Sequence, residues 1–374
     1  MFTKITSLLL LSAAALPQVF AAGKEFKISV ANPTSAVVTE VVEAAVPASA
    51  GDFASLALYN AKGEAVGYQP MLAERKIAFV ATVQAKADEV FTLKSGKPQL
   101  PQPLTYGRIV PERLDDYAWE TPYSAWRMYS TTLLDKEPNT SNGIDMWCKR
   151  IGSLMVDSLY AISKNGGRYH NEHSMGGDGY QVGGQTLGCG GVAAFSNNKL
   201  WLHKPFDTCY TVHNGPYRTE FVLVYRRVEV EGDFYTKTVR ITASANSLLC
   251  KAVVKYEGKA KPMQLATGLF LHKATGGVPY LSRSGGRIAY AEKNSEGTWT
   301  TPFRYFEGIY IPNSSSVGFI YDNHLMLSAD YTPNTEFTYY FGGTNSLNSA
   351  AQITTDNGWF DAIDKFAPEQ LVVK

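Results

Sequence analysis

The segment from Tyr169 to Tyr180 is the part of the sequence richest in chemically active side chains, with two histidines and two carboxylates. A histidine has a near-neutral pKa and can both remove and deliver a proton, so His170 is the candidate general base. The hydroxyls of Tyr169 and Tyr180 are the candidate general acids. The segment is rich in Gly and has weak periodicity, which is typical of a functional loop inside a compact domain.

The same segment permits two other interpretations. His173 and Glu172, together with His170 and Asp178, are candidate ligands of a divalent metal such as Ca²⁺ or Zn²⁺. Their spacing matches no metalloprotease helix motif, and acid–base chemistry by a histidine requires no cofactor. The third interpretation is a hydrogen-bonded loop with solvated histidines, and the sequence leaves all three open.

A second group lies in residues 145–150, which read Asp-Met-Trp-Cys-Lys-Arg. On a strand, Asp145, Trp147 and Lys149 would share one face and place an aromatic ring between an acid and a base. Sugar rings stack on Trp, and Lys pairs with carboxylate or sulfate groups. The alternative is a cross-strand salt bridge that flanks a core Trp.

Two further positions combine Arg with polar partners. Arg127 and Tyr129 share a face if residues 126–129 form a strand, and they could clamp an anionic sugar, although Arg127 could equally be buried against Asp115 or Glu120. Arg218 and Glu220 would project from one side of the strand that follows the Asn-Gly-Pro turn at 214–216. The predicted catalytic residues are therefore Arg127, Lys149, Tyr169, His170 and Tyr180, and the predicted substrate-binding residues are Asp145, Trp147, Asp178, Arg218, Glu220 and His272.

Strands must position these residues, because the composition of 22 Tyr, 18 Phe, 32 Gly and 18 Pro favours strands and turns over helices. Alternation of apolar and polar residues over 26–30, 218–231 and 234–244 predicts half-buried strands. We predict an all-β chain in which residues 23–97 form a small N-terminal β-sandwich. A proline-rich linker at 98–103 leads to a larger β-supersandwich domain at 104–374, which carries the site.

Residues 1–22 have the pattern of a secretory signal peptide, with Lys4, an apolar run and small residues at the expected cleavage site. No Cys follows that run, so a lipid anchor is not expected, and no later stretch is apolar enough to span a membrane. The sequence thus predicts a periplasmic or secreted protein. In that setting the four cysteines (Cys148, Cys189, Cys209 and Cys250) form one or two disulfides or remain buried thiols. A formal net charge of +1 gives no reason to expect a nucleic-acid partner.

Several short motifs occur in a characteristic order. They are Arg113-Leu114-Asp115-Asp116, Trp126-Arg127-Met128-Tyr129, Gly143-Ile144-Asp145-Met146-Trp147, Tyr169-His170, Asp178-Gly179-Tyr180, Gly188-Cys189-Gly190-Gly191 and Asn214-Gly215-Pro216-Tyr217-Arg218-Thr219. This ordered set resembles the DUF4861 family of exported bacterial proteins. The resemblance implies a galactose-mutarotase-like β-supersandwich, a role in polysaccharide utilisation and a partner that is an acidic oligo- or polysaccharide.

Three functions fit these expectations. A lyase would cleave uronic-acid-containing glycans by β-elimination, with Arg127, Lys149 or Arg218 neutralising the carboxylate, His170 as base and Tyr169 or Tyr180 as acid. A glycoside hydrolase would pair Asp145 with Glu172 or Asp178. A non-catalytic glycan-binding protein would need only the aromatic rings and a basic pocket. The lyase is the main prediction.

Overall fold

The computed structural model describes residues 25–140, 142–295, 298–312 and 315–374. The predicted signal peptide lies outside these residues. The prediction of an all-β chain is confirmed, because strands in five sheets account for about half of the described residues and α1 (Val156–Lys164) and α2 (Asp356–Lys365) are the two α-helices among them. Short 3-10 turns lie at Ala48–Ala50, Phe53–Ser55, Pro111–Arg113 and Thr131–Asp135. The search of this part of the chain for a helix long and apolar enough to cross a membrane finds none.

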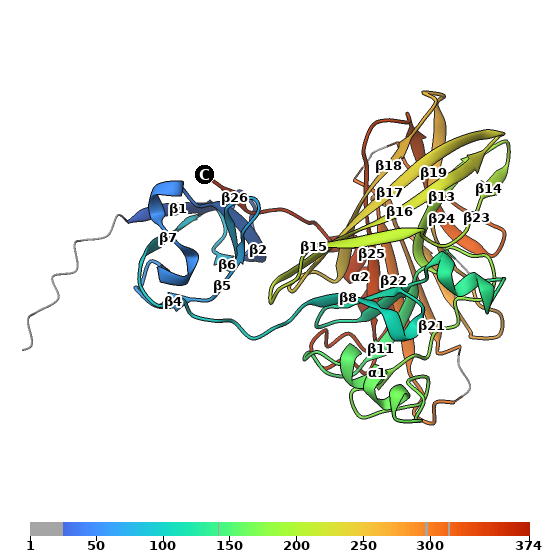
Figure 1. The fold of residues 1–374 in the computed structure, drawn as a ribbon, viewed down its shortest axis with the longest axis horizontal. Helices are drawn as coiled ribbons and strands as arrows, with labels where there is room; N and C mark the ends of the chain where they lie inside the picture. The colour runs from blue at the N-terminus through green and yellow to red at the C-terminus, as the bar shows by residue number, and fades with distance from the viewer. Residues whose placement is uncertain (1–24, 141, 296–297, 313–314) are drawn as a thin grey trace, which may run out of the picture.

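The N-terminal part is a small sandwich of two sheets (Figure 1). One sheet contains β1 (Phe26–Ala31), β7 (Asp88–Ser95), β3 (Leu56–Tyr59) and β4 (Ala65–Val66), and the other contains β2 (Val38–Ala45), β6 (Lys76–Val83) and β5 (Tyr68–Met71). Alternate side chains such as Val30, Phe79 and Leu93 fill the space between them. The last strand of the chain, β26 (Val372–Val373), pairs with β1, so the sandwich includes a strand from outside the predicted range 23–97.

The larger part is built around an eight-stranded antiparallel sheet. Its strands, in spatial order, are β15 (Thr208–His213), β16 (Arg218–Val230), β17 (Asp233–Ser244), β18 (Leu249–Glu257), β25 (Phe337–Asn345), β22 (Arg304–Tyr310), β21 (Arg287–Lys293) and β20 (Val278–Leu281). One face packs on a five-stranded sheet, and the other is partly covered by α2 through Trp359, Phe360 and Ile363. The five-stranded sheet contains β14 (Lys199–Trp201), β13 (Cys189–Ser196), β19 (Met263–Phe270), β24 (His324–Tyr331) and β23 (Val317–Tyr321).

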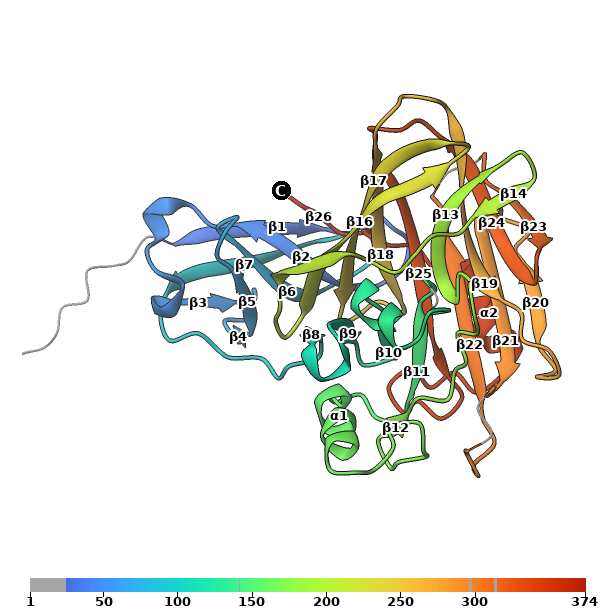
Figure 2. The same cartoon turned by 45° about the vertical axis from the view of Figure 1, so that its right-hand side comes forward.

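A third sheet in this part positions most of the predicted site. It contains β8 (Tyr106–Val110), β9 (Asp116–Glu120), β10 (Ala125–Met128), β11 (Asp145–Lys149) and β12 (Gly176–Gly177). Because side chains alternate along a strand, Trp119, Trp126 and Met146 enter the main core. Trp147 and its neighbours on the opposite face pack against α1. We call this opposite face, which also carries Glu120, Arg127, Asp145 and Lys149, the α1-side face. Figure 2 shows α1 beside β11 and β12.

Gln69 is one of the residues that connect the small sandwich to the large sheet. The side-chain nitrogen of Gln69 on β5 donates to the carbonyl of Arg218 at 2.8 Å. Its oxygen accepts from the backbone N–H groups of Tyr217 (3.1 Å) and Arg218 (2.8 Å). The Arg218 side chain pairs with Glu43 on β2. The turn at 214–218 is therefore a contact between the small sandwich and the large sheet.

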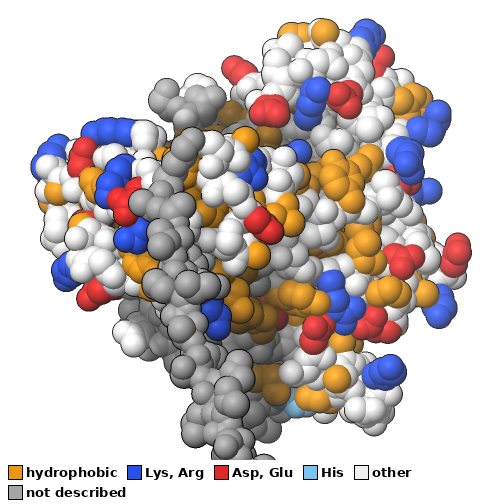
Figure 3. All heavy atoms as spheres, turned by 60° about the vertical axis from the view of Figure 1, so that its left-hand side comes forward, with side chains coloured by type: hydrophobic (Ala, Val, Ile, Leu, Met, Phe, Trp, Pro, Cys, Tyr) orange, Lys and Arg blue, Asp and Glu red, His pale blue; other side chains and the backbone are white. Residues whose placement is uncertain are grey.

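All four cysteines are free thiols, and Cys148, Cys189 and Cys250 are buried in the core. The alternative of buried thiols therefore holds in this structure, and the disulfides do not form. On the face in Figure 3, cationic and anionic side chains are interspersed, in keeping with the near-neutral net charge.

Candidate functional site

A pocket of about 440 Å³ opens at the edge of the α1-side face. It brings together five of the predicted residues, namely Arg127, Tyr169, His170, Asp178 and Tyr180. The remaining lining comes from Arg113, Tyr129, the segment 137–140 and the segment 181–184. The loop that follows α1 reaches the pocket because its residues 176–177 pair with β11 as β12.

Arg127 is the centre of the hydrogen-bond network in this pocket. Its Nη2 lies 2.7 Å from Oδ2 of Asp145 and 3.4 Å from Oδ2 of Asp178. Its guanidinium also donates to the hydroxyls of Tyr169 at 2.9 Å and Tyr129 at 3.1 Å. Burial alone would lower the pKa of Arg127. The surrounding tyrosines and Asp145 outweigh burial and raise the pKa well above its usual value, so the guanidinium stays charged.

The two carboxylates that share Arg127 have unused hydrogen-bonding capacity. Oδ1 of Asp145 and Oδ1 of Asp178 are both buried and have no hydrogen-bond partner among the described residues. Burial, and then the charge of Asp178, raises the pKa of Asp145 to about 6 despite Arg127. Tyr129 donates to Oδ2 of Asp145 at 3.0 Å. Asp145 therefore lies behind Arg127 and Tyr129 and does not line the pocket.

His170 and Asp178 form an acid–base pair at the pocket wall. Nδ1 of His170 lies 3.2 Å from Oδ2 of Asp178, and about a third of the histidine side chain is exposed (33%). The ring packs on Tyr169 with 4.3 Å between ring centroids, which fixes its orientation. Nε2 of His170 has no hydrogen-bond partner within the described ranges, so it is free to exchange a proton with a ligand.

Lys149 is not in the pocket, contrary to its predicted role. Its ammonium is fully buried and lies 2.5 Å from Oε2 of Glu120. The Glu120 carboxylate also accepts the backbone N–H groups of Met155 and Val156 at the start of α1. Burial lowers the pKa of Lys149. This pair fixes the helix to the sheet, and Trp147 packs between it and Arg127 without lining the pocket.

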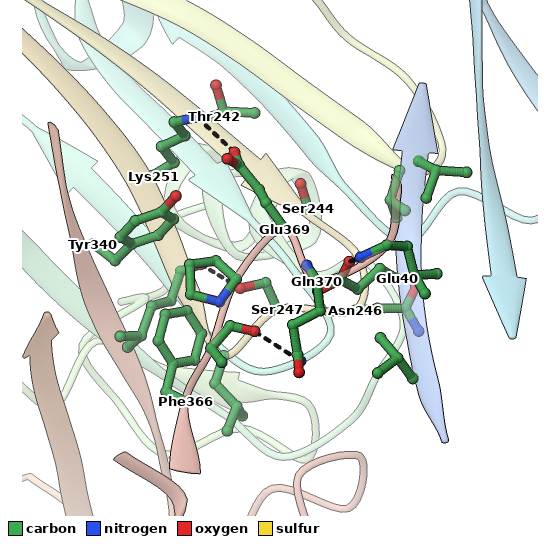
Figure 4. A pocket seen from close by; sticks show the side chains of 18 of the residues that line it. Glu40, Thr242, Ser244, Asn246, Ser247, Lys251, Tyr340, Phe366, Glu369 and Gln370 are labelled. Carbon is green, nitrogen blue, oxygen red and sulfur yellow. Dashed lines mark hydrogen bonds and ion pairs between the residues drawn. The ribbon is translucent and has the colours of Figure 1, made fainter. Parts of the chain in front are cut away.

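Arg218 and Glu220 are also remote from His170. Arg218 pairs with Glu43, and Glu220 pairs with Arg240. Both line a larger pocket of about 870 Å³ between the small sandwich and the eight-stranded sheet. Figure 4 shows another ion pair in that pocket, between Lys251 and Glu369 at 2.5 Å. Glu40 accepts the N–H groups of the returning C-terminal segment 370–371. This larger pocket is thus a contact region between two parts of the fold.

Tyr180 and His272 belong to a buried network behind the pocket. The Tyr180 ring lines the pocket, but its hydroxyl donates to Oε2 of Glu307 at 3.3 Å. Burial, and then Glu307, raises the pKa of Tyr180 well above its usual range. His272 pairs through Nδ1 with Glu292 at 2.7 Å. Tyr180 is therefore unsuited to donate a proton to a ligand, and His272 has a structural partner.

The two predicted metal ligands do not converge. Glu172 pairs with Arg150 at 2.5 Å and accepts from the backbone N–H groups of Thr300 and Thr301. Nε2 of His173 is hydrogen-bonded to the carbonyl of Arg168 at 2.9 Å. Within the described residues no group of three or more His, Cys, Asp or Glu side chains is arranged to hold a metal ion.

Arg113 is a pocket residue that the predicted set omits. Its guanidinium lies 5.9 Å from the centroid of the Tyr169 ring, and its buried Nε has no partner among the residues described. The two residues that follow, Leu114 and Asp115, have positive φ angles of 57° and 65°, which are costly for side chains of this kind. Ser130 fixes this turn by donating to the Leu114 carbonyl at 2.7 Å. The sequence signal was the Arg-Leu-Asp-Asp motif, whose turn has no regular periodicity.

Comparison with known proteins identifies the family of this chain. Residues 36–371 match the family described as "Domain of unknown function (DUF4861)". The chain belongs to this family. A curated relative, "Uncharacterized protein P7" of Formosa agariphila, is 27% identical over 259 residues, which are 67% of this chain and 59% of that protein. The chain thus spans about three fifths of the length of this relative.

Two solved structures from Enterococcus faecalis are distantly similar. A protein in glycosyl hydrolase family 38 aligns with a TM-score of 0.43 and 8% identity over 94% of this chain and 47% of its own. An α-mannosidase from strain V583 aligns with a TM-score of 0.37 and 9% identity over 94% of this chain and 46% of its own. Scores this low do not bear on the activity of this chain.

Proposed function

We propose that this chain is a carbohydrate-active enzyme of the lyase type, which cleaves uronic-acid-containing glycans by β-elimination in the pocket around His170. The observation that carries the proposal is the His170–Asp178 pair, because a partly exposed imidazole with a carboxylate behind it is suited to remove a proton. Export through residues 1–22 remains a prediction that fits a polymeric substrate.

Residues that line the pocket supply the base and the acid that the elimination needs. Nε2 of His170 takes the C5 proton of the uronate, and Asp178 stabilises the imidazolium that forms. The C4–O bond breaks as the electron pair of the former C5–H bond forms the C4–C5 double bond. The Tyr169 hydroxyl gives its proton to the departing O4, and Arg127, which already donates to the Tyr169 oxygen at 2.9 Å, stabilises the phenolate.

Arg113 is the candidate that neutralises the uronate carboxylate and so acidifies C5–H. Arg127 is occupied by two carboxylates, Lys149 by Glu120 and Arg218 by Glu43. Arg113 lines the pocket and takes part in none of the ion pairs found among the described residues, so its fork of donors is available for a carboxylate.

The test is a panel of uronate polysaccharides assayed for the ultraviolet absorbance of the new double bond and for new reducing ends. We expect unsaturated product from wild type and a loss of roughly 10²- to 10⁴-fold in kcat for His170→Ala. His173→Ala is the matched control, because it removes a neighbouring histidine whose ring is bonded to the Arg168 carbonyl outside the pocket.

Other outcomes identify the alternatives. Reducing ends without unsaturation would indicate a glycoside hydrolase, but Asp145 and Glu172 do not line the pocket, so the predicted carboxylate pairs receive little support. Affinity without any product would indicate a binding protein. Full activity of His170→Ala would overturn the assignment of the base.

A further inference from the structure

A second pocket, of about 390 Å³, is lined by residues 199–205, Asp207 and residues 225–229. Tyr129 lines the first pocket, whereas Pro205 and Asp207 line the second. Phe206 joins them, because its backbone N–H donates to the Tyr129 carbonyl at 3.2 Å. The segment 205–207 therefore links the wall of the second pocket to a residue of the His170 pocket.

Four exposed cations line this second pocket: Lys199, Lys204, Arg226 and Arg227. None of them takes part in an ion pair with another described residue. Only two acids, Asp207 and Glu229, share the lining, so the pocket has an excess of two positive charges (4 − 2). A chain whose formal net charge is only +1 thus concentrates unpaired cations at one place.

A β-bulge explains how two successive arginines reach one pocket. Neighbouring residues on a regular strand point to opposite faces. The register between β16 and β17 shifts between Tyr225 and Val228, and Arg227 has a positive φ of 54°. Such bulges cost backbone energy and often aim side chains at a site.

The floor of the pocket contains an unneutralised charge. Nε2 of His203, which lines the pocket, lies 2.9 Å from Nζ of Lys237. The buried Lys237 donates to the Val192 carbonyl at 2.6 Å and faces the rings of Tyr225 and Tyr256, with no carboxylate beside it in the described part of the chain. Burial lowers the pKa of Lys237 to about 7, because no carboxylate among the described residues offsets the lost hydration of the ammonium.

The lining also offers an aromatic surface. The half-buried Trp201 ring lines the pocket and is held by a hydrogen bond from its Nε1 to Ser196 at 3.0 Å. The ammonium of Lys199 lies 3.7 Å from the ring centroid. An aromatic ring beside unpaired cations suits a sugar ring that carries an anionic group.

We propose that this second pocket binds an anionic sugar unit, through its carboxylate or sulfate group, of the same glycan that enters the His170 pocket. The link to one glycan rests on the proposed function, whereas the binding of an anionic sugar is tested without catalysis. Lys204, Arg226 and Arg227 provide charge-assisted hydrogen bonds to the anionic group, and the protonated ammonium of Lys237, held by His203 at 2.9 Å, adds positive potential behind them.

The experiment titrates the full chain carrying His170→Ala with three oligosaccharides of equal length by calorimetry: an oligouronide, a sulfated oligosaccharide and a neutral one. Adding Lys204→Gln and Arg226→Gln should weaken binding of an anionic ligand by about 10-fold or more. The matched control adds Lys273→Gln and Arg283→Gln, which remove two exposed cations elsewhere on the surface, and it should keep the original affinity. Circular dichroism checks that each variant is folded, and Lys204→Gln alone repeats the test with one change.

Each result separates the two proposals. Equal binding of the neutral ligand, or unchanged affinity in the Lys204 and Arg226 variants, would overturn the second site even if wild type proves to be a lyase. Loss of anionic binding in those variants supports the second site even if no polysaccharide is cleaved. Comparing the carboxylated with the sulfated ligand identifies the anionic group.

Discussion

Two buried ion pairs lie at opposite ends of the α1-side face, and their surroundings differ. Lys149 pairs with Glu120 at one end, and Arg127 pairs with Asp145 at the other, with Trp147 between them. At the Lys149 end both oxygens of Glu120 accept hydrogen bonds, including those from the first residues of α1. At the Arg127 end two carboxylates share one cation, and each retains a buried oxygen without a partner among the described residues.

We infer that this difference separates a structural ion pair from the pair that belongs to the proposed site. The same combination of cation and carboxylate is closed off by α1 in one case and borders a pocket in the other. Uncompensated polar atoms in a buried place are costly, so their retention beside a partly exposed histidine indicates a role in binding or chemistry. The residue types alone do not distinguish the two ends.

The largest effect on stability is expected from breaking the Lys149–Glu120 pair, which α1 closes off from solvent and which we call the closed end. Glu120→Ala leaves the Lys149 ammonium buried without its partner and removes the acceptor at the start of α1. We expect the free energy of unfolding to fall by about 3–5 kcal/mol, measured by denaturant titration. The double variant Glu120→Gln with Lys149→Met should recover part of the loss, because it removes the buried charge. A loss below about 1 kcal/mol would show that the Lys149–Glu120 pair contributes little to stability, contrary to its structural role.

Changes at the Arg127 end, which borders the His170 pocket and which we call the open end, should alter activity more than stability. Asp178→Asn keeps the shape of the side chain but removes the charge that stabilises the His170 imidazolium. We expect kcat to fall on the order of 10²-fold on a substrate identified by the polysaccharide panel, with a smaller stability change than in Glu120→Ala. A variant that loses as much stability as Glu120→Ala while keeping its kcat would reverse the comparison.

The sequence predicts which residues share a strand face, but it does not predict which residues pair across strands. Alternation predicts that Asp145, Trp147 and Lys149 share a face, and the structure forms β11 over these residues. Alternation says nothing about partners on neighbouring strands, because these depend on the register between the strands. The register sets Arg127 opposite Asp145, whereas the sequence alone offered Asp115 or Glu120 as alternative partners. The all-β class and the family follow from patterns spread along the chain, which no single register changes.

Two other features lay beyond sequence reasoning for different reasons. The strand β26 has only two residues and pairs with β1 across almost the whole chain length, so no local pattern reveals it. Arg113 precedes two left-handed residues, Leu114 and Asp115. Asp adopts this conformation more readily than most residue types, but Leu rarely does, so the residue types do not predict the turn. Local preference fails in both places because tertiary contacts determine the conformation.

The smallest effect concerns Asp116, which lies on β9 of the same face, near the open end. Burial raises its pKa to about 7, although Arg127 and Arg113 oppose the shift. An acid whose pKa is raised on folding binds more protons in the folded state, so stability should fall as pH rises from about 4 to 7. The slope from this group is at most about 1.4 kcal/mol per pH unit.

Asp116→Asn should flatten this dependence, because the amide resembles the neutral acid and does not titrate. The measurement is the free energy of unfolding at pH 5 and pH 7 for wild type and variant. Asp145, with its pKa raised to about 6, acts in the same direction, so some slope should remain. Burial also raises the pKa of Glu307 well above its usual value. If the slope is unchanged in Asp116→Asn, the other buried carboxyls, Asp145 and Glu307, carry it, and Asp116 is not a source of the pH dependence.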